Sequence, residues 1–284
     1  QQNTADTTRQ SSRLGMASGW LLAVSLLCMP LAQADAEKGL AIATEQKARD
    51  RGWGDSESEL QMVLRTAQGR ESVRRMRTLA LEVQGDGDKS LTIFDEPLDV
   101  RGSAFLTHSH PTAEDDQWLY LPSVKRTRRI ASRNKSGPFM ASEFAYEDMT
   151  SFELEKFSFN YLRDEPCAEL TCYVVEQTPT DTFSGYSKIL VWVDQQHYRV
   201  MRAEYYDRKA ALLKILTAED YRLYLERYWR PHKLTMQNQQ TGKSTDLLLE
   251  SIRFNTGRSA ADFDVAVKKR KATRSKKLFI SQNK

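Results

Sequence analysis

Cysteine and histidine are scarce in this chain, and the short motifs that mark several common enzyme classes are missing. The 284 residues include three cysteines and four histidines. No HExxH, G-x-S-x-G or glycine-rich dinucleotide-binding motif is present, so nothing indicates a zinc protease, an α/β-hydrolase or a Rossmann enzyme. The segment TGKST at 241–245 resembles the end of a phosphate-binding loop, but Gln237 stands where that loop needs glycine. We interpret it as a hairpin turn and predict neither catalysis nor a cofactor.

Two of the four histidines raise the question of a metal site. His108 and His110 are spaced so that both would lie on one face of a strand, and acids follow at 114–116. Such side chains can bind zinc. Pro111 ends the strand, however, and the acids fall in a loop. We therefore favour exposed histidines and predict no metal site.

No apolar run reaches the ~20 residues that a membrane-spanning helix needs. The longest, at 15–32, follows two arginines, is interrupted by Pro30 and precedes the small residues of AQADA. This pattern predicts a secretory signal peptide over residues 1–36. A retained anchor is the weaker alternative. Lipid attachment at Cys28 is disfavoured because the bulky Leu27 precedes it.

Cleavage would leave Cys167 and Cys172, an even number in an oxidising compartment. Their close spacing, with Pro166 beside them, predicts a local disulfide that clips a hairpin. The alternative is a pair of reduced structural thiols. The chain shows no internal repeat and no low-complexity linker, so one domain is expected.

Alternating apolar residues indicate strands along most of the chain. Helical spacing occurs once, from Glu37 to the glycines at 52 and 54, and predicts a single N-terminal helix. From Glu59 onward the period is two, and turn residues separate the segments. The stretch at 211–229 also fits a helix; we predict mostly strand, with a bulge or turn near 218–220. More than ten strands and one helix predict a mainly β fold, a single curved antiparallel sheet that forms a complete or incomplete barrel.

Before the C-terminal tail, the segment with the most closely spaced basic residues is VKRTRRIASRNK at 124–135. It contains no aromatic residue that could stack on bases, so nucleic acid is not the expected partner. A solvated edge strand, protected from aggregation by its charges, is the simplest interpretation. A binding surface for lipid head groups or for a partner is the alternative. The candidate residues are Lys125, Arg126, Arg128, Arg129 and Arg133.

A second basic segment closes the chain: residues 268–284 contain KKRKATRSKK. We expect a disordered, solvated tail there. Attraction to an anionic membrane surface is the alternative.

An aromatic and methionine-rich segment, GPFMASEFAYEDM at 137–149, follows the basic one directly. Methionine and aromatic side chains together suit an adaptable apolar cavity wall. Packing in an ordinary core is the equally open alternative. The candidates for the cavity wall are Phe139, Met140, Phe144, Tyr146, Met149, Phe152, Phe157, Phe159 and Tyr161.

The run WLYLPSVKRTRRIASRNKSGPFMASEFAYEDM resembles the family of outer-membrane lipoprotein-sorting proteins, a LolA-like group of periplasmic β-proteins. In that family a strand ending in Tyr-Leu-Pro leads into a basic stretch and then a loop close to GSxFSYED. The segments KILVWVDQQHYRVMRAEYYD and YWRPHKLTMQNQQTGKSTDL, and Phe263, fit its second half. The similarity runs from Glu59 to Val267. Ala141-Ser142-Glu143 departs from the family's Gly-Ser-Asp-like step.

The resemblance implies a half-open barrel over residues 37–267, with short lid helices and a concave face that binds acyl chains. It further implies a periplasmic carrier of a Gram-negative bacterium that handles lipids or lipoprotein acyl chains with an inner-membrane exporter of the resistance-nodulation-division (RND) superfamily. We expect a monomer. The alternatives are a non-carrying accessory subunit that docks such an exporter and, less favoured, a hydrolase of lipids or glycans.

Overall fold

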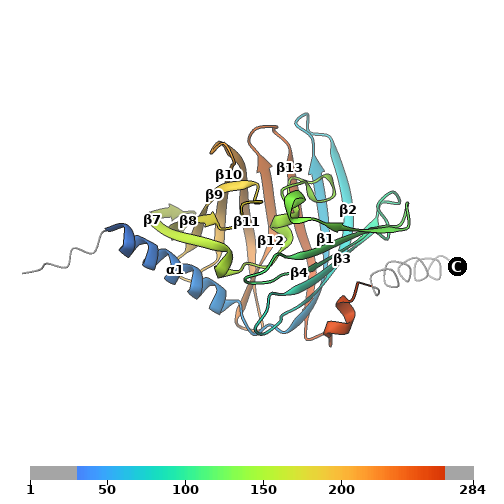
Figure 1. The fold of residues 1–284 in the computed structure, drawn as a ribbon, viewed down its shortest axis with the longest axis horizontal. Helices are drawn as coiled ribbons and strands as arrows, with labels where there is room; N and C mark the ends of the chain where they lie inside the picture. Colours follow the sequence, from blue (N-terminus) through green and yellow to red (C-terminus); the bar gives the residue numbers. More distant parts are fainter. Residues whose placement is uncertain (1–30, 266–284) are drawn as a thin grey trace, which may run out of the picture.

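Antiparallel pairing of successive strands builds nearly the whole structure (Figure 1). The computed structural model describes residues 31–265, so the predicted basic tail and most of the predicted signal peptide lie outside the described residues. One α-helix, α1 (Leu31–Arg49), comes first. The strands that follow are β1 (Asp55–Arg65), β2 (Glu71–Leu81), β3 (Lys89–Glu96), β4 (Ala104–His108), β5 (Asp116–Leu121), β6 (Arg126–Ile130), β7 (Phe157–Cys167), β8 (Leu170–Pro179), β9 (Tyr186–Asp194), β10 (Val200–Asp207), β11 (Leu212–Tyr224), β12 (Tyr228–Asn238) and β13 (Ser244–Phe254).

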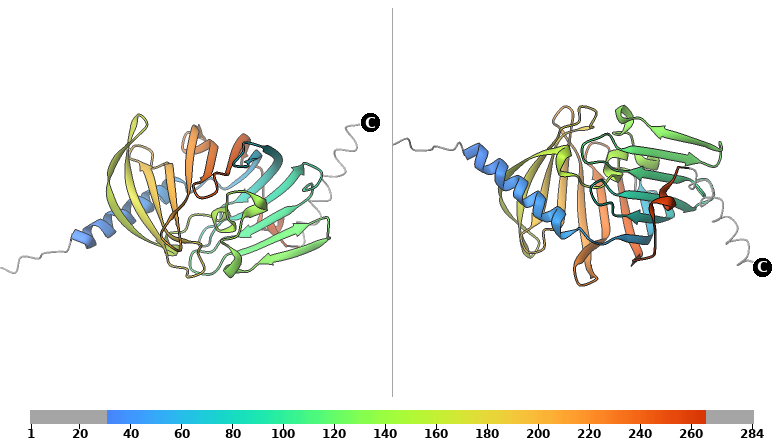
Figure 2. Two further views of the ribbon diagram at one scale, coloured as in Figure 1. Left: turned by 90° about the horizontal axis from the view of Figure 1, so that it is seen from above. Right: turned by 60° about the horizontal axis from the view of Figure 1, so that its bottom comes forward.

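These thirteen strands form one sheet, in the order β6-β5-β4-β3-β2-β1-β13-β12-β11-β10-β9-β8-β7. Strands that are neighbours in sequence pair with each other, except β6 and β7, and the pairing of β1 with β13 joins the two halves. Strands β6 and β7 are therefore the two edges. Within residues 31–265 they do not pair, so the curved sheet stays open (Figure 2). The predicted mainly β fold with a half-open barrel is confirmed.

The chain between the two edges crosses the concave side of the sheet. We call residues 131–156 the strap. It contains four short 3₁₀ turns, η1 (Ser132–Asn134), η2 (Phe139–Ala141), η3 (Tyr146–Met149) and η4 (Leu154–Lys156), which are the lid helices that the resemblance implies. Figure 2 shows the strap inside the curve of the sheet. The aromatic segment at 137–149 is thus the middle of a crossover.

Helix α1 packs against β7 and β8. Its Ile42 and Ala43 are buried in the same cluster as Phe159 and Val175. Gly39 allows the close approach, because a Cβ there would lie 2.8 Å from the backbone nitrogen of Tyr161. The helix begins at Leu31, earlier than predicted, so the last six residues of the predicted signal peptide are helical. It ends at Arg49, shortly before the predicted stop at 52–54.

Both faces of the sheet are buried at β3 and β4. On the concave face, Phe94 and Phe105 pack around Phe139 of the strap. On the opposite face, Leu91 and Leu106 pack with Phe263 from η5 (Ala260–Phe263). Strands β3 and β4 therefore bury side chains on both sides.

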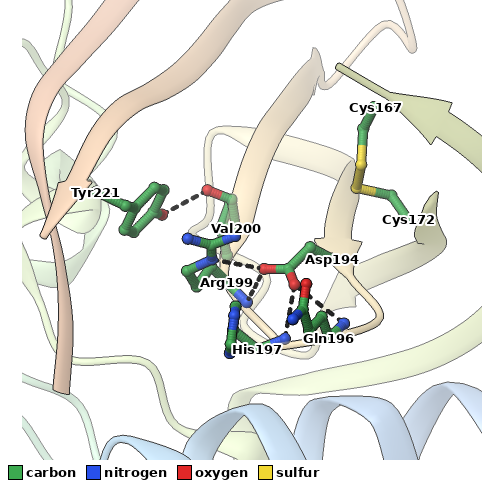
Figure 3. The surroundings of a disulfide bond; sticks show 8 residues. All are labelled: Cys167, Cys172, Asp194, Gln196, His197, Arg199, Val200 and Tyr221. Carbon is green, nitrogen blue, oxygen red and sulfur yellow. Dashed lines mark hydrogen bonds and ion pairs between the residues drawn. A yellow bond between two sulfur atoms is a disulfide. The ribbon is translucent and has the colours of Figure 1, made fainter. Parts of the chain in front are cut away.

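A disulfide joins Cys167 to Cys172 where β7 turns into β8 (Figure 3). Cys172 is buried against Val174 and Trp192. The neighbouring turn is closed by the buried Asp194, whose carboxylate accepts hydrogen bonds from backbone N–H groups at 196, 197 and 199 and pairs with the Arg199 side chain. These contacts fix the ends of the hairpins.

The ambiguous stretch at 211–229 contains β11, the turn at 225–227 and the first two residues of β12. The predicted strand is confirmed, but no bulge interrupts it: the register runs without a shift from Lys214 opposite Asn238 to Tyr224 opposite Tyr228. Within β11, Asp220 alone takes a left-handed backbone conformation, with φ 51°, and the other two such residues of the stretch, Leu225 and Glu226, lie in the turn that follows. Because pairing resumes in the same register beyond it, the strand continues.

Candidate functional site

A cavity of about 610 Å³ lies between the strap and the second half of the sheet. Its volume falls within the roughly 300–1,000 Å³ typical of ligand pockets. The sheet side is largely aliphatic and comes from alternate residues of β9 to β12. This wall consists of Ile189, Val191, Val200, Ala203, Leu216, Ala218 and Leu234, with Tyr186, Tyr205 and Tyr221. The opposite side comes from the strap and from the β4–β5 loop at 111–115.

Two of the nine predicted wall residues line this cavity, Phe152 and Phe157. Their rings stack at a centroid distance of 6.0 Å. They lie where the strap joins β7, at one end of the cavity. The other seven predicted residues are placed elsewhere.

Phe139 and Phe144 fill the first half of the barrel. They are 0% and 4% exposed and belong to a core with Met62, Phe94 and Phe105. Met140, Tyr146 and Met149 pack against the edge of that core. The first half of the concave face is therefore closed by protein.

Phe159 and Tyr161 belong to the packing beneath α1. Phe159 is buried with Ile42, and Lys38 of the helix lies over the Tyr161 ring, 3.4 Å from its centroid. The structure thus divides the nine candidates among a core, a helix contact and the wall of this cavity.

A buried ion pair anchors the strap beside the cavity. Lys214 Nζ of β11 lies 2.6 Å from Asp148 Oδ2, and the two side chains are only 4% and 6% exposed. Lys214 also donates to the Glu143 carbonyl at 3.0 Å. Asp148 accepts from the Ala145 backbone N–H and, at 2.7 Å, from the Tyr186 hydroxyl. The polar groups of this cluster are thereby satisfied within the protein.

Burial and the neighbouring carboxylates raise the pKa values of two groups beside this ion pair, Tyr186 and Glu147. Burial, followed by the charge of Asp148, raises the pKa of Tyr186 well above its usual value. Burial also raises the pKa of Glu147. That carboxylate accepts from the Ser184 hydroxyl at 2.8 Å and from the Gly185 N–H at 2.9 Å. The acids at 147 and 148 therefore attach the strap to β9 and β11 and are held by fixed partners.

Two more ion pairs connect the strap to loops at the cavity rim. Lys156 pairs with Asp115 of the β4–β5 loop, and Lys135 pairs with Asp181 of the β8–β9 loop. All four residues line the cavity. These contacts, which we call the rim pairs, hold the strap in place at positions where a ligand would pass.

The predicted basic residues lie on or next to edge strand β6. Arg129 pairs with Asp116, whereas no ion pair involves Lys125, Arg126 or Arg128 within the described residues. The fifth, Arg133, follows in η1 and is exposed. Arg128 and Arg133 line a smaller cleft of about 330 Å³ with Tyr146. The strand is thus a charged, solvated edge, and one part of it faces a cleft.

The two histidines are not exposed, and that prediction is wrong. His108 is half-buried, lies edge-on to Trp118 and has Nε2 2.9 Å from the Phe263 carbonyl. Burial lowers its pKa. His110 places Nδ1 2.9 Å from Asp86. Within residues 31–265 no group of three or more potential ligands could hold a metal ion.

The residues that sequence reasoning missed are the aliphatic cavity wall and Lys214. The alternation of apolar side chains in SKILVWVD and its neighbours was visible, but it marks any buried strand. Lys214 interrupts the apolar run ALLKIL, and a lysine inside a buried strand could have indicated an internal acidic partner.

Comparisons with known proteins show which families and structures the chain resembles. A protein-family model described only as "Uncharacterized protein" matches residues 86–267. No curated protein matches the chain. In the structure, no helix among the described residues is long and apolar enough to cross a membrane.

Several solved structures are similar to the chain over most of its length. A domain provisionally named as an outer membrane lipoprotein-sorting protein domain, from Vibrio parahaemolyticus, is 58% identical, with a TM-score of 0.81 and coverage of 82% of this chain and 99% of that one. A DUF1329 family protein from Desulfovibrio piger is 26% identical, with a TM-score of 0.78 and coverage of 82% and 98%. A LolA superfamily protein from Nitrosomonas europaea, at 22% identity and a TM-score of 0.65 over 80% and 98%, shares the fold.

Proposed function

We propose that this chain, which belongs to the LolA-like family of outer-membrane lipoprotein-sorting proteins, is a periplasmic carrier that holds an acyl chain in its 610 Å³ cavity. The cavity is the observation that carries the proposal. It lies between the strap and the second half of the sheet, and its sheet wall is largely aliphatic. A lipid or the acyl chain of a lipoprotein has the matching chemistry.

Burial of the chain would supply the affinity. Each buried methylene contributes about 0.8 kcal/mol, so ten of them would contribute about 8 kcal/mol before the costs of association. No covalent step is needed. The buried acids beside the cavity are held by Lys214, Tyr186 and backbone N–H groups, and we assign them to the attachment of the strap and not to catalysis.

Further parts of the proposal follow from the family. We infer a carrier that works as a monomer and exchanges its cargo with an inner-membrane exporter of the RND superfamily. The RND partner and the choice between free lipid and lipoprotein come from the resemblance alone. Reciprocal co-purification with the exporters of the host, after crosslinking in cells, tests the partner separately from the cargo.

Native mass spectrometry of protein purified from the periplasm without detergent tests the carrier function, with organic extraction of what it carries. A defined lipid or acylated peptide near one-to-one is the expected result. Protein that arrives empty and also takes up no added phospholipid would overturn the proposal.

A variant in which a larger side chain fills the cavity tests whether the lipid binds there. Val200 lines the cavity and is half-buried, so Val200→Trp should occupy the space of the ligand and remove most of the co-purified lipid. The control is Val124→Trp, because Val124 is 58% exposed and does not line the cavity. Equal lipid content in both variants would contradict the assignment of this cavity.

The open edge favours a second candidate function, a docking subunit that carries nothing. Strand β6 leaves one side of its backbone unpaired and presents Arg126 and Arg128 to solvent. A partner with an acidic surface could bind there. In that case neutralising these arginines would abolish co-purification of the exporter, and the wild-type protein would contain no lipid.

A further inference from the structure

The strap separates two hollows that share one wall residue. Ile130, the last residue of β6, lines both the 610 Å³ cavity and the smaller cleft of about 330 Å³. The turn η1 that follows places Ser132 and Lys135 on the larger cavity and Arg133 and Asn134 on the smaller cleft. The apolar space and the cleft therefore meet along one short piece of chain.

The charges of the two hollows differ. Lys135 and Lys156 line the larger cavity, and each is paired with an aspartate. The smaller cleft is lined by Arg128 and Arg133, and neither forms an ion pair within the described residues. Its other lining residues, Ile130, Asn134, Ser136, Gly137 and Tyr146, include no acid. Two guanidinium groups thus face a cleft without a counter-charge.

Tyr146, which lines this cleft, is held by contacts with the core. Tyr146 packs edge-on against Phe139, at a centroid distance of 6.0 Å, and tilts against Phe105 at 5.6 Å. Gln117 Nε2 donates to the Tyr146 carbonyl at 2.8 Å. Gly137 N–H donates to the Asn134 carbonyl at 3.0 Å, which closes the turn above it. The two arginines therefore stand on a preformed frame.

We propose that the cleft between Arg128 and Arg133 binds the phosphate-bearing, net-anionic head group of the lipid whose acyl chain occupies the neighbouring cavity. This inference rests on the proposed carrier function and adds the class of cargo to it. Guanidinium groups match phosphate oxygens with paired hydrogen bonds. Because Ile130 lines both hollows, the cleft lies directly beside the apolar cavity.

The test is competition between two lipids for the full-length mature protein. Vesicles of phosphatidylglycerol and phosphatidylcholine in equal amounts are offered to delipidated protein, and native mass spectrometry counts each bound lipid. We expect a preference of about tenfold for phosphatidylglycerol, since tenfold corresponds to ~1.4 kcal/mol and charge-assisted hydrogen bonds reach that range. Without any preference, the head-group assignment would be overturned and the carrier function would stand. Without uptake of either lipid, both would fail.

The variant Arg128→Gln/Arg133→Gln should reduce the preference to within about twofold while total bound lipid stays the same. Both side chains are exposed, so folding should be preserved. The matched control is Lys125→Gln/Arg126→Gln, which removes two charges of the same basic segment that do not line the cleft. The same loss of preference in the control would show a general charge effect and refute a specific site.

The last part of the experiment uses soluble anions as competitors of the bound lipid. Glycerol 3-phosphate and inorganic phosphate carry the same chemistry without a chain. If the cleft binds the head group of a lipid whose acyl chain occupies the cavity, millimolar glycerol 3-phosphate should leave phosphatidylglycerol bound. Displacement of the lipid, or binding of free phosphate as tight as that of the lipid, would make the cleft a site for soluble anions and would overturn the inference.

Discussion

The aromatic side chains of the strap have two different environments, a core and a cavity wall. Substitutions in the two environments should differ in their effects on stability and on lipid content. Phe139 is fully buried among Phe94 and Phe105, so Phe139→Ala should lower the free energy of unfolding by about 3–5 kcal/mol. Phe152 is half-buried on the cavity wall. Phe152→Ala should cost roughly 1 kcal/mol and mainly reduce lipid content. Urea unfolding and native mass spectrometry of both variants give the comparison.

Similar losses of stability in the two variants would mean that Phe152 is core as well. In that case the aromatic end of the cavity would be closed, and a ligand would contact only the aliphatic wall formed by β9 to β12.

The buried pair of Lys214 and Asp148 should be strongly coupled. Asp148→Asn removes the counter-charge of the buried Lys214 ammonium group, and we expect a loss of about 3–5 kcal/mol. Lys214→Met should cost less, because Asp148 keeps the Ala145 N–H and the Tyr186 hydroxyl. The double variant should recover roughly 1–3 kcal/mol relative to the sum of the single changes.

Thermal and urea unfolding of the four proteins in this cycle measure the coupling energy. The exposed pair of Lys233 and Glu219, with side chains 45% and 56% exposed, is the control. Glu219→Gln should change stability by less than about 1 kcal/mol. Additive effects at 148 and 214 would show that the strap does not depend on this pair.

Asp88, in the β2–β3 turn, should make stability depend on pH. Burial raises its pKa to about 6, so the folded protein holds a proton there that the unfolded chain releases near pH 4. Stability should therefore fall as pH rises from about 4 to 6 and stay lower above that window. Asp88→Asn removes this loss, and we expect a gain of about 1–2 kcal/mol at pH 7.5.

Unfolding at pH 4 and at pH 7.5 checks this sign, since wild type and Asp88→Asn should differ little at the lower pH. A gain of the same size at both values would attribute the effect to something other than this carboxyl group.

Sequence patterns indicated which side chains are buried, but not which part of the protein or which cavity each of them contacts. Phe139, Phe152 and Phe159 all lie in one aromatic stretch, yet one fills a core, one lines a cavity and one packs beneath α1. Their surroundings come from strands far away in sequence. The wall of β9 to β12 was missed for the same reason, because a strand that borders a cavity has the same alternation as one that borders a core.

At the scale of elements, the contact between α1 and β7 depends on one small residue. Alanine is favoured over glycine in a helix by about 1 kcal/mol, so Gly39→Ala would stabilise an isolated helix. Here the added Cβ would lie 2.8–2.9 Å from backbone atoms of Tyr161 and Asn160. We therefore expect a net loss of stability and faster proteolysis within α1.

Ala41→Gly is the control for that helix, because Ala41 is exposed and should cost only the propensity difference of about 1 kcal/mol. A stabilised Gly39→Ala protein would show that α1 is free to move away from β7.

Strands were predicted better than the ends of the helix. Period-two alternation and turn residues located the strands other than β6 because each of them buries side chains, whereas β6 was expected from its charges as a solvated edge. The start of α1 was placed at Glu37 because a cleavage site was expected before it, whereas the helix runs from Leu31. At Asp220 the sequence indicated an irregularity, and the pairing of neighbours absorbed it without a change of register.

At the scale of the whole molecule, the open barrel follows from where the two edges stand in the chain. Strands β6 and β7 are consecutive, so the segment between them must cross the gap, and that segment is the strap. Pattern analysis could count strands but could not decide between a closed and an open barrel. Closure depends on pairing between the edges, which alternation does not encode; the half-open form was an expectation from the family resemblance.

The rim pairs should govern how fast a ligand leaves. Lys156 with Asp115, and Lys135 with Asp181, join the strap to two loops that line the cavity. Their side chains are between 16% and 33% exposed, so each pair contributes little to global stability but restrains local opening. Asp115→Asn/Asp181→Asn should therefore leave the melting temperature nearly unchanged and raise the rate of lipid release about tenfold.

Transfer of a fluorescent phospholipid from loaded protein to acceptor vesicles measures this rate. High salt should accelerate release from the wild type, because it screens partly exposed charges, and should have a smaller effect on the double variant, whose pairs are already broken. A control with Glu219→Gln, at the exposed ion pair between β11 and β12, should release lipid at the wild-type rate. If the double variant also releases lipid at the wild-type rate, then the ligand must leave without movement of the strap, through the open side between β6 and β7.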